Sequence, residues 1–419
     1  MGEAAGSKLD LSAEGGAGAV LDEIDLTGAT IGLQGADLRG VRLRRAKLAR
    51  LDLRGADLRG ASLGQADLRR AKLDEADLRD ADLAGADLRG ARFEQADLRV
   101  ALLEDAVLRR TVLRFAKLDG AAFEGADLRG ADLWGVTAPG MVAPGADLRG
   151  ATLREADLRD ADLAGADLRG AALGQAVLVG AKLRGADLRR SVPAGADLSA
   201  ADLSDAKLQG LDLSGCRLAG ARLRGAWLDK TRIGRDQLGE ALGEELAGEF
   251  DAARLAYLGL ERHFRAAGDP GAESWAYRRR RRMQKFDALR AGRAARLAGD
   301  TRGALGGYGN YASDLVVEWV CDYGESITRI LRTMVLVYVA FTILYGVAGS
   351  VVDTNTGQIT RDPGDLAIFS LLAMTTPGNP PVGLGPRNVS VHILTGLQAL
   401  LGVGLAGLLG FVTGNMVRR

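Results

Sequence analysis

A leucine or a close substitute occupies every fifth residue from Leu33 to Ile233, which makes 41 positions in one unbroken register. A small residue, usually alanine, lies two positions before each of these centres. A period of five fits neither an amphipathic helix, with a period of 3.6, nor a single strand, with a period of two. It predicts a solenoid, in which stacked repeats bury a shared core. The centres that are not leucine or isoleucine are Phe93, Phe123, Ala138, Ala143 and Pro193.

The repeating unit reads ADLRG, as at residues 36–40, 56–60 and 126–130. It resembles the pentapeptide-repeat family, and the resemblance covers about half of the chain. The family implies a right-handed quadrilateral β-helix with four pentapeptides in each coil and with the leucine and alanine side chains inside. About ten coils at the ~4.8 Å spacing of strands make a rod of roughly 50 Å.

We expect the β-helix to cover residues 33–238 and residues 1–32 to form a tail or a cap. Pro139, Pro144 and Pro193 lack a donor for the strand ladder, so they predict local bulges or edge positions. The register resumes at Leu148 and Leu198, which predicts that the solenoid continues through these prolines.

The next residues change to a helical pattern. Residues 239–298 are expected to form a helical hairpin with an arginine-rich second helix, and they resemble one tetratricopeptide-type unit. Residues 299–325 are expected to hold a glycine-rich linker and then an interfacial helix. The run of arginines in the hairpin is Arg278, Arg279, Arg280, Arg281 and Arg282. A solvated helix face and contact with anionic lipid headgroups both explain this run, whereas nucleic-acid binding is not expected without interleaved aromatic residues.

Two apolar segments predict a membrane protein. Residues 333–352 and 389–417 contain no charged residue over 20 and 29 positions. Each is long enough to cross a hydrocarbon core, which takes about 20 residues, although a buried helix of a soluble protein is the alternative. Basic residues flank the two spans on one side, which predicts a multi-pass protein of the cell (inner) membrane with both termini in the cytoplasm.

The segment between these spans is unusual. Residues 365–376 are apolar but too short to span, and the loop after them holds Pro377, Pro380, Pro381 and Pro386. Irregular backbone at membrane depth is tolerated only inside protein or beside a water-filled cavity. The layout therefore predicts a pore domain over residues 326–419, with a pore helix at 365–376 and a filter loop at 375–381.

Residues 369–379, FSLLAMTTPGN, are similar to the pore helix and filter of the two-transmembrane, potassium-channel-like family of tetrameric cation channels. This resemblance covers residues 326–417 and implies a homotetramer whose filter carbonyl groups and threonine hydroxyl groups replace the water shell of the ion. It puts these residues at filter positions: Thr375, Thr376, Pro377, Gly378, Asn379 and Pro380. Pro377, Asn379 and Pro380 depart from the family pattern, which favours weakly selective passage of monovalent cations and leaves the charge sign of the ion open.

The second span offers two further hypotheses. Its many glycines permit either close helix packing or a hinge at an inner gate. The residues of such a gate or hinge would be Leu401, Gly402, Leu405, Gly407, Leu408 and Val412. His392, near the outer end, is either a structural histidine or a proton sensor.

Several classes of function are excluded by residues that the sequence lacks. It contains two histidines and two cysteines without metal-ligand spacing, and no catalytic or nucleotide-binding motif, so we expect no enzyme, metal or cofactor. Residues 33–233 hold 34 basic and 30 acidic residues, which argues against a DNA mimic. The sequence thus predicts an ion channel with a cytoplasmic β-helix that docks a protein partner or regulates the pore. A membrane-anchored scaffold without conduction is the alternative.

Overall fold

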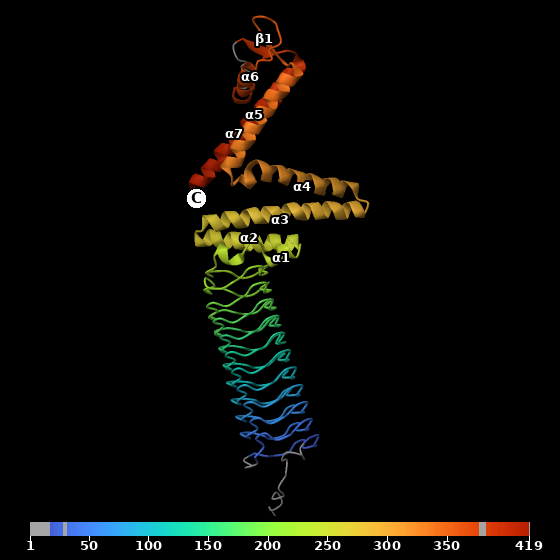
Figure 1. Ribbon diagram of the computed structural model, residues 1–419, viewed down its shortest axis with the longest axis vertical. Coiled ribbons are helices and arrows are strands. Elements are labelled where there is room, and N and C mark those ends of the chain that lie inside the picture. The colour runs from blue at the N-terminus through green and yellow to red at the C-terminus, as the bar shows by residue number, and fades with distance from the viewer. Residues whose placement is uncertain (1–16, 28–31, 377–382, 419) are drawn as a thin grey trace, which may run out of the picture. The chain divides into compact units, whose positions relative to one another are not determined.

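The computed structural model describes residues 17–27, 32–376 and 383–418 (Figure 1). The chain divides into two compact units, Met1–Ala276 and Tyr277–Arg419. The first unit contains the coils and the short helices that follow them: η1 (Arg235–Leu238), α1 (Gly243–Leu246) and α2 (Phe250–Ala267). Helix α3 (Pro270–Leu297) crosses the boundary between the units, so the expected hairpin at 239–298 is divided between them.

The second unit is helical apart from one short sheet. Its elements are α4 (Thr301–Cys321), η2 (Asp322–Gly324), α5 (Ile327–Ala348), β1 (Val351–Asp353), α6 (Pro363–Thr375), β2 (Leu384–Pro386) and α7 (Val389–Arg418). Strands β1 and β2 pair in antiparallel register, with Val352 opposite Gly385. The predicted first span, pore helix and second span therefore correspond to α5, α6 and α7, with ends that differ by a few residues.

The solenoid confirms the prediction of four pentapeptides per coil. Parallel bridges join residues 20 positions apart, beginning with Asp37 and Asp57 and ending with Asp212 and Arg232. The central leucines and the alanines before them are buried along almost the whole stack. Each coil buries little apolar surface alone, so its stability depends on the coils stacked above and below it.

The consensus ADLRG follows from the backbone of the coil. The central N–H group donates to the next coil, as from Leu58 to the Asp77 carbonyl oxygen at 2.7 Å. The fourth N–H group points away from the ladder, and the carboxylate of the second residue accepts from it, as from Arg59 to Asp57 at 3.3 Å. The fifth residue has a positive φ, +64° at Gly60, which explains the frequent glycine there.

The three prolines of the solenoid behave differently. Pro139 and Pro144 occupy fourth positions, whose N–H groups do not belong to the ladder, and the bridges of Thr137 and Val142 stay regular. The structure therefore has neither a bulge nor an edge position, the two predicted alternatives, at these prolines. Pro193 occupies a central position and removes a ladder donor, and among the described residues no bridge joins positions 192 and 212. The Cys216 thiol donates to the Pro193 carbonyl oxygen at 3.1 Å. The coils continue beyond all three prolines, as predicted.

The solenoid begins earlier than expected. Val20 pairs with Arg42 and Asp25 with Lys47, which are separations of 22 residues instead of 20. Residues 17–27 therefore belong to a first coil with two additional residues, although their sequence is out of register with the repeat. Residues 1–16 and 28–31 of the expected tail lie outside the described residues.

Helix α1 covers the last coil. The Glu244 carboxylate accepts from the N–H groups of Leu223 at 2.8 Å and Arg224 at 2.7 Å, and Gly243 N donates to the Ala221 carbonyl oxygen at 2.9 Å. These bonds satisfy backbone groups that an open sheet edge would leave unpaired. The solenoid therefore ends in a cap built by residues that the period of five does not describe.

Helix α4 replaces the expected glycine-rich linker at 299–310. The Asp300 carboxylate accepts from Gly303 N at 3.0 Å and caps the helix. A side chain at Gly307 would lie only 2.5 Å from the Cα atom of Gly292, so the glycines allow α3 and α4 to touch through their backbones. Tertiary packing thus overrides the weak helix propensity of glycine at this point.

Candidate functional site

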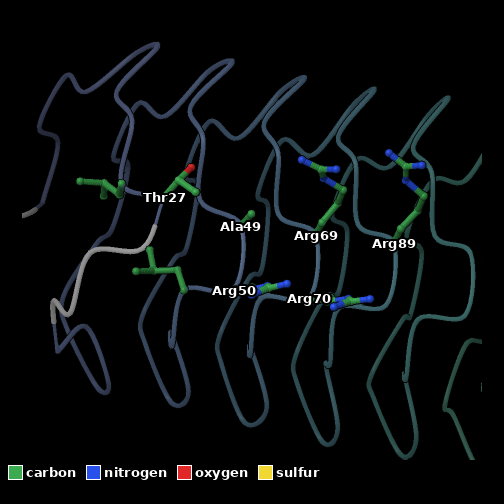
Figure 2. A pocket seen from close by; sticks show the side chains of 8 residues that line it. Thr27, Ala49, Arg50, Arg69, Arg70 and Arg89 are labelled. Carbon is green, nitrogen blue, oxygen red and sulfur yellow. The ribbon is translucent and has the colours of Figure 1, made fainter.

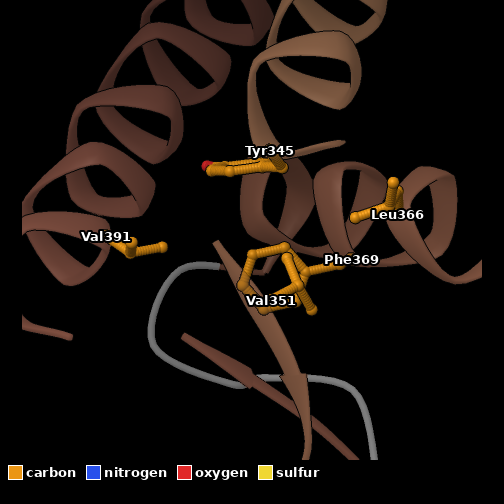
Figure 3. Close-up of a cluster of buried hydrophobic side chains, with 5 residues drawn as sticks. All are labelled: Tyr345, Val351, Leu366, Phe369 and Val391. Atoms are coloured by element: carbon orange, nitrogen blue, oxygen red, sulfur yellow. The ribbon is translucent and has the colours of Figure 1, made fainter. Parts of the chain in front are cut away.

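The candidate site is the cluster of helices in which α6 packs against α5 and α7. Tyr345, Val351, Leu366, Phe369 and Val391 form its buried apolar core (Figure 3). The rings of Tyr345 and Phe369 meet edge to face, with 5.2 Å between their centroids. This contact fixes the short helix α6 against the end of α5.

A buried polar network joins the same three helices. The amide of Gln398 donates to the Ser370 carbonyl oxygen at 3.0 Å and to its hydroxyl oxygen at 2.8 Å. The Tyr345 hydroxyl donates to the Gln398 side-chain oxygen at 2.8 Å, and the Ser370 hydroxyl donates to the Tyr338 carbonyl oxygen at 3.1 Å. Gln398 and Ser370 are fully buried. The sequence prediction missed this network, although a glutamine inside an apolar span was a signal for it.

Only part of the predicted filter can be located. The hydroxyl groups of Thr375 and Thr376 donate back to the carbonyl oxygens of Leu371 at 2.8 Å and Leu372 at 2.9 Å, and both threonines are exposed at the end of α6. The other predicted filter residues lie outside the described residues: Pro377, Gly378, Asn379 and Pro380.

Gly402 lies at a close contact between α6 and α7. A Cβ atom at this position would come within 2.2 Å of the Met374 carbonyl oxygen. The absence of a side chain therefore lets α7 touch the end of α6, which favours the packing hypothesis over the hinge hypothesis for this glycine.

The other predicted gate residues lie on different faces of α7. Leu405 and Val412 are buried, Leu408 is half-buried, and Leu401 and Gly407 are exposed. Of these residues, only Leu401 and Gly407 are exposed on this chain and open to contact with another subunit. The gate hypothesis itself stays a prediction.

The arginine run of α3 has acidic partners in α4 and at the start of η2. Arg278 pairs with Asp322 at 3.1 Å, Arg281 with Asp314 at 2.8 Å, and Arg282 with Glu318 at 2.8 Å. Lys285, which is buried, also pairs with Glu318. Three of the five arginines predicted to touch lipid are thus engaged inside the second unit, while the Arg280 guanidinium lies 5.2 Å from the ring centroid of Tyr277. The three acidic residues follow one another at intervals of four residues, which places them on one face of a helix and was a sequence signal for this pairing.

The turn between α4 and α5 continues this cluster. Asp322 and Tyr323 both have positive φ angles, 50° and 59°, which is a strained conformation for residues other than glycine. Arg329, in the first turn of α5, donates to the Glu318 carbonyl oxygen at 2.7 Å and lies 3.5 Å from Asp322. Burial, followed by the charge of Glu318, raises the pKa of Tyr323. The turn is therefore held by charged groups on both sides.

Three further observations concern metal ligands, the cysteine thiols and His392. No group of three or more histidine, cysteine or acidic residues suited to a metal occurs in the described part of the chain. Cys216 and Cys321 are free and buried, and burial raises the pKa of both thiols. The side chain of His392 is exposed.

An arginine-lined hollow lies at one corner of the first coils (Figure 2). Arg69 and Arg89 pair with the aspartates two positions before them, at 2.6 and 2.5 Å. Arg50 and Arg70 occupy fifth positions with positive φ and point along the other side of the corner. The hollow is open to solvent, and its arginines form part of the outer charged surface.

The coil geometry and the repeat agree with one family. A family model described as pentapeptide repeats matches the chain in eight copies, over residues 33–65, 61–99, 101–136, 144–178, 156–192 and 196–233. Residues 33–233 are a pentapeptide-repeat domain. The match ends at residue 233, so it assigns no function to the helical unit.

Solved structures with similarity to this domain include HetL, a pentapeptide repeat protein involved in heterocyst differentiation regulation from the cyanobacterium Nostoc sp. strain PCC 7120. It is 36% identical over 51% of this chain and 88% of its own, with a TM-score of 0.29. QnrB1, a plasmid-mediated fluoroquinolone resistance protein, is 20% identical over 45% of this chain and 96% of its own, with a TM-score of 0.29. No curated protein matches the chain. Because the TM-scores are low, the assignment of the pentapeptide-repeat domain rests on the family match and on the 20-residue coil.

Two helices of the other unit are long and apolar enough to cross a membrane. They are Ile327–Ala348 and Val389–Gly414, and 17% and 22% of their most apolar windows are buried within the chain. Length and composition alone are weak support, because the core helix of a soluble protein passes the same test. Such a core helix, however, is mostly buried, and these two are not.

Proposed function

We propose that the chain is one subunit of a tetrameric ion channel of the cell membrane, with the pentapeptide-repeat domain as its cytoplasmic regulatory or docking domain. One observation carries the proposal: the apolar helix α6, only 13 residues long, is held between two helices of spanning length. At 1.5 Å per residue α6 is about 20 Å long, which is too short to cross a bilayer. A short helix followed by a proline-rich loop between two spans is the layout of a pore subunit.

The polar network supports a position in lipid. Tyr345, Ser370 and Gln398 satisfy one another inside the helix cluster, as the hydrocarbon environment requires of polar groups. A merely anchoring pair of helices has no need of a third helix fixed in this way. The network therefore favours a pore over a tether.

The outer faces of α5 and α7 support lipid or subunit contact. Large apolar side chains on these faces are about half exposed or more: Val335, Ile343, Val347, Val389, Ile393, Leu400 and Phe411. A monomeric soluble protein rarely exposes so much contiguous apolar surface. Lipid tails and neighbouring subunits would cover these side chains in a tetramer.

The departures from the family filter, together with the two exposed threonines, favour weakly selective conduction of monovalent cations. Movement of the pentapeptide-repeat domain would reach α5 along a path of two parts. These are the ion pairs between α3 and α4 and the strained turn at Asp322. The exposed arginines of α3, which are Arg290, Arg293 and Arg296, would remain available for anionic lipid.

Purified full-length protein in planar bilayers tests this proposal. We expect single-channel currents, a tetrameric mass in detergent, and reversal potentials under asymmetric salt that follow the cation gradient. Gly402→Leu, which would collide with α6, should abolish the current, whereas Gly404→Ala, with open space around the glycine, should conduct. A monomer, or a tetramer that passes no ion, would overturn the proposal and leave a membrane-anchored scaffold.

A further inference from the structure

The outer surface of the pentapeptide-repeat domain carries a ladder of ion pairs along most of its length. An aspartate at the second position pairs with the arginine at the fourth position and also approaches the arginine of the coil before it. Arg149, for example, lies 2.6 Å from Asp147 and 3.6 Å from Asp167. Such a surface is polar and internally neutralised.

One face of three successive coils carries no charged side chain at its second positions. The second positions there hold Leu102, Ala122 and Val142, which the strand bridges place directly in line. Leu102 is 43% exposed and Val142 40%, and Val100 at the neighbouring corner is 56% exposed. The positions before and after this run hold Asp82 and Asp162, so the apolar strip has sharp ends.

Acidic side chains line the strip. Glu104 and Glu124 occupy the next corner in two successive coils, and Asp105 stands beside Glu104. Asp119 lies at the corner on the opposite side, one coil after Arg99, whose guanidinium group pairs with Asp97. Within the described residues none of these four carboxylates takes part in an ion pair or hydrogen bond, in contrast to the paired aspartates of the ladder. The strip and these four acids together are called the apolar–acidic face.

We propose that the apolar–acidic face binds an amphipathic helix of a partner protein, in which lysine or arginine residues flank an apolar stripe. Charge complementarity selects the partner: unpaired carboxylates on both sides of the strip attract cations, and they repel an anionic membrane surface. The spacing selects a helix. Coils are stacked at about 4.8 Å, and one helical turn rises 5.4 Å, so a helix lying along the strip places about one apolar residue on each coil.

This interaction does not depend on conduction by the helical unit. It would give the cytoplasmic domain a docking function in a channel or in a scaffold alike. The binding energy would come from the apolar strip, and the acidic rim would mainly accelerate association and exclude other partners.

The test measures binding of two designed helical peptides of about five turns to the full-length protein by fluorescence anisotropy. One peptide has leucines on a single stripe flanked by lysines, and the other has the same stripe flanked by glutamates. We expect the lysine peptide to bind and the glutamate peptide to bind at least about tenfold more weakly.

The informative variant is Leu102→Asp with Val142→Asp, because the coils on either side of the strip carry aspartate at this position, Asp82 and Asp162, and the coil should therefore fold. We expect this double variant to bind the lysine peptide about tenfold or more weakly. Val177→Asp, a change at a second position on another face, is the matched control and should bind normally, and circular dichroism should show intact coils in both. Equal binding of the two peptides, no binding of the lysine peptide, or undiminished binding by the double variant would each overturn the proposal. Self-association that is lost in the double variant would assign the face to a second copy and would also overturn it.

Discussion

The Tyr345 hydroxyl donates a 2.8 Å hydrogen bond to the side chain of Gln398, which lies 53 positions later in the chain and on a different helix. Replacing Gln398 by leucine leaves buried hydrogen-bonding groups of Tyr345 and Ser370 without partners. We expect a loss of about 1–3 kcal/mol in the free energy of unfolding. Thermal unfolding in detergent measures it, and Leu400→Ala, an exposed apolar change on the same helix, is the control. An unchanged midpoint for Gln398→Leu would contradict the structural role of the network.

The cap of the solenoid should respond to pH through Glu244. Burial raises the pKa of this carboxyl above its usual value of about 4.3. Since the folded pKa is raised, the contribution of Glu244 to stability is fully present below the unfolded pKa and decreases as the pH rises through the folded pKa. We expect Glu244→Gln to remove that decrease, which begins above about pH 4, measured as the difference in unfolding midpoint from the wild type.

Glu244→Ala should act differently. It removes the acceptor for the N–H groups of Leu223 and Arg224, so we expect a loss of about 1–3 kcal/mol at all pH values. If glutamine and alanine had the same effect, the carboxylate would not be capping the last coil.

The aspartate ladder should make the coils sensitive to acid. The hydrogen bond from Arg39 lowers the pKa of Asp37 to about 2, and the one from Arg54 lowers that of Asp52 to about 2. Because the pKa values of these aspartates are lower in the folded than in the unfolded chain, the aspartates stabilise the fold above the unfolded pKa near about 4. This stabilisation is lost as the pH falls towards about 2. We expect the β-helix signal in circular dichroism to weaken over this window.

Asp147→Asn and Asp147→Ala separate charge from geometry within the ladder. Asparagine retains an oxygen that accepts from Arg149 N, whereas alanine does not, so alanine should destabilise more. High salt should reduce the effect of asparagine and leave the additional effect of alanine. The reverse order would mean that the surface ion pair, rather than the backbone cap, is what the aspartate provides.

The prolines offer a matched pair. Pro193→Leu restores a ladder donor and a central leucine, so we expect a gain of about 1–2 kcal/mol. Pro139→Arg changes a fourth position where no ladder donor is missing, and it should be nearly neutral. Urea unfolding followed by circular dichroism compares the two, and a destabilised Pro193→Leu variant would contradict the expectation that the missing ladder donor lowers stability at this coil.

Glu318 should be essential to the pairing of α3 with α4. Its removal leaves the buried ammonium group of Lys285 unpaired, which costs about 3–5 kcal/mol. We expect Glu318→Gln to increase hydrogen exchange in both helices. Exchanging the two charges, with Glu318→Lys and Lys285→Glu together, should restore protection, and failure of that rescue would argue against a specific pair.

The sequence predicted the coil well because the period alone decides which side chains face inward at every step. Local signals also located α5, α6 and α7. They could not reveal the contact of Tyr345 with Gln398, because only the packing of three helices brings these residues together. The partners of the arginine run were missed for another reason: glycines at 303–309 have weak helix propensity, and only the contact of Gly307 with Gly292 shows why they form a helix.

The 20-residue bridge has a consequence for how such a rod changes in length. Inserting one pentapeptide between Leu102 and Val142 would carry every later residue a quarter of the way around the coil, so these two residues would no longer share a face. Inserting 20 residues would lengthen the rod by about 4.8 Å and leave all faces aligned. The length of this domain can therefore change in steps of one whole coil. Such a change moves the two ends of the domain apart and leaves the side chains of every face aligned.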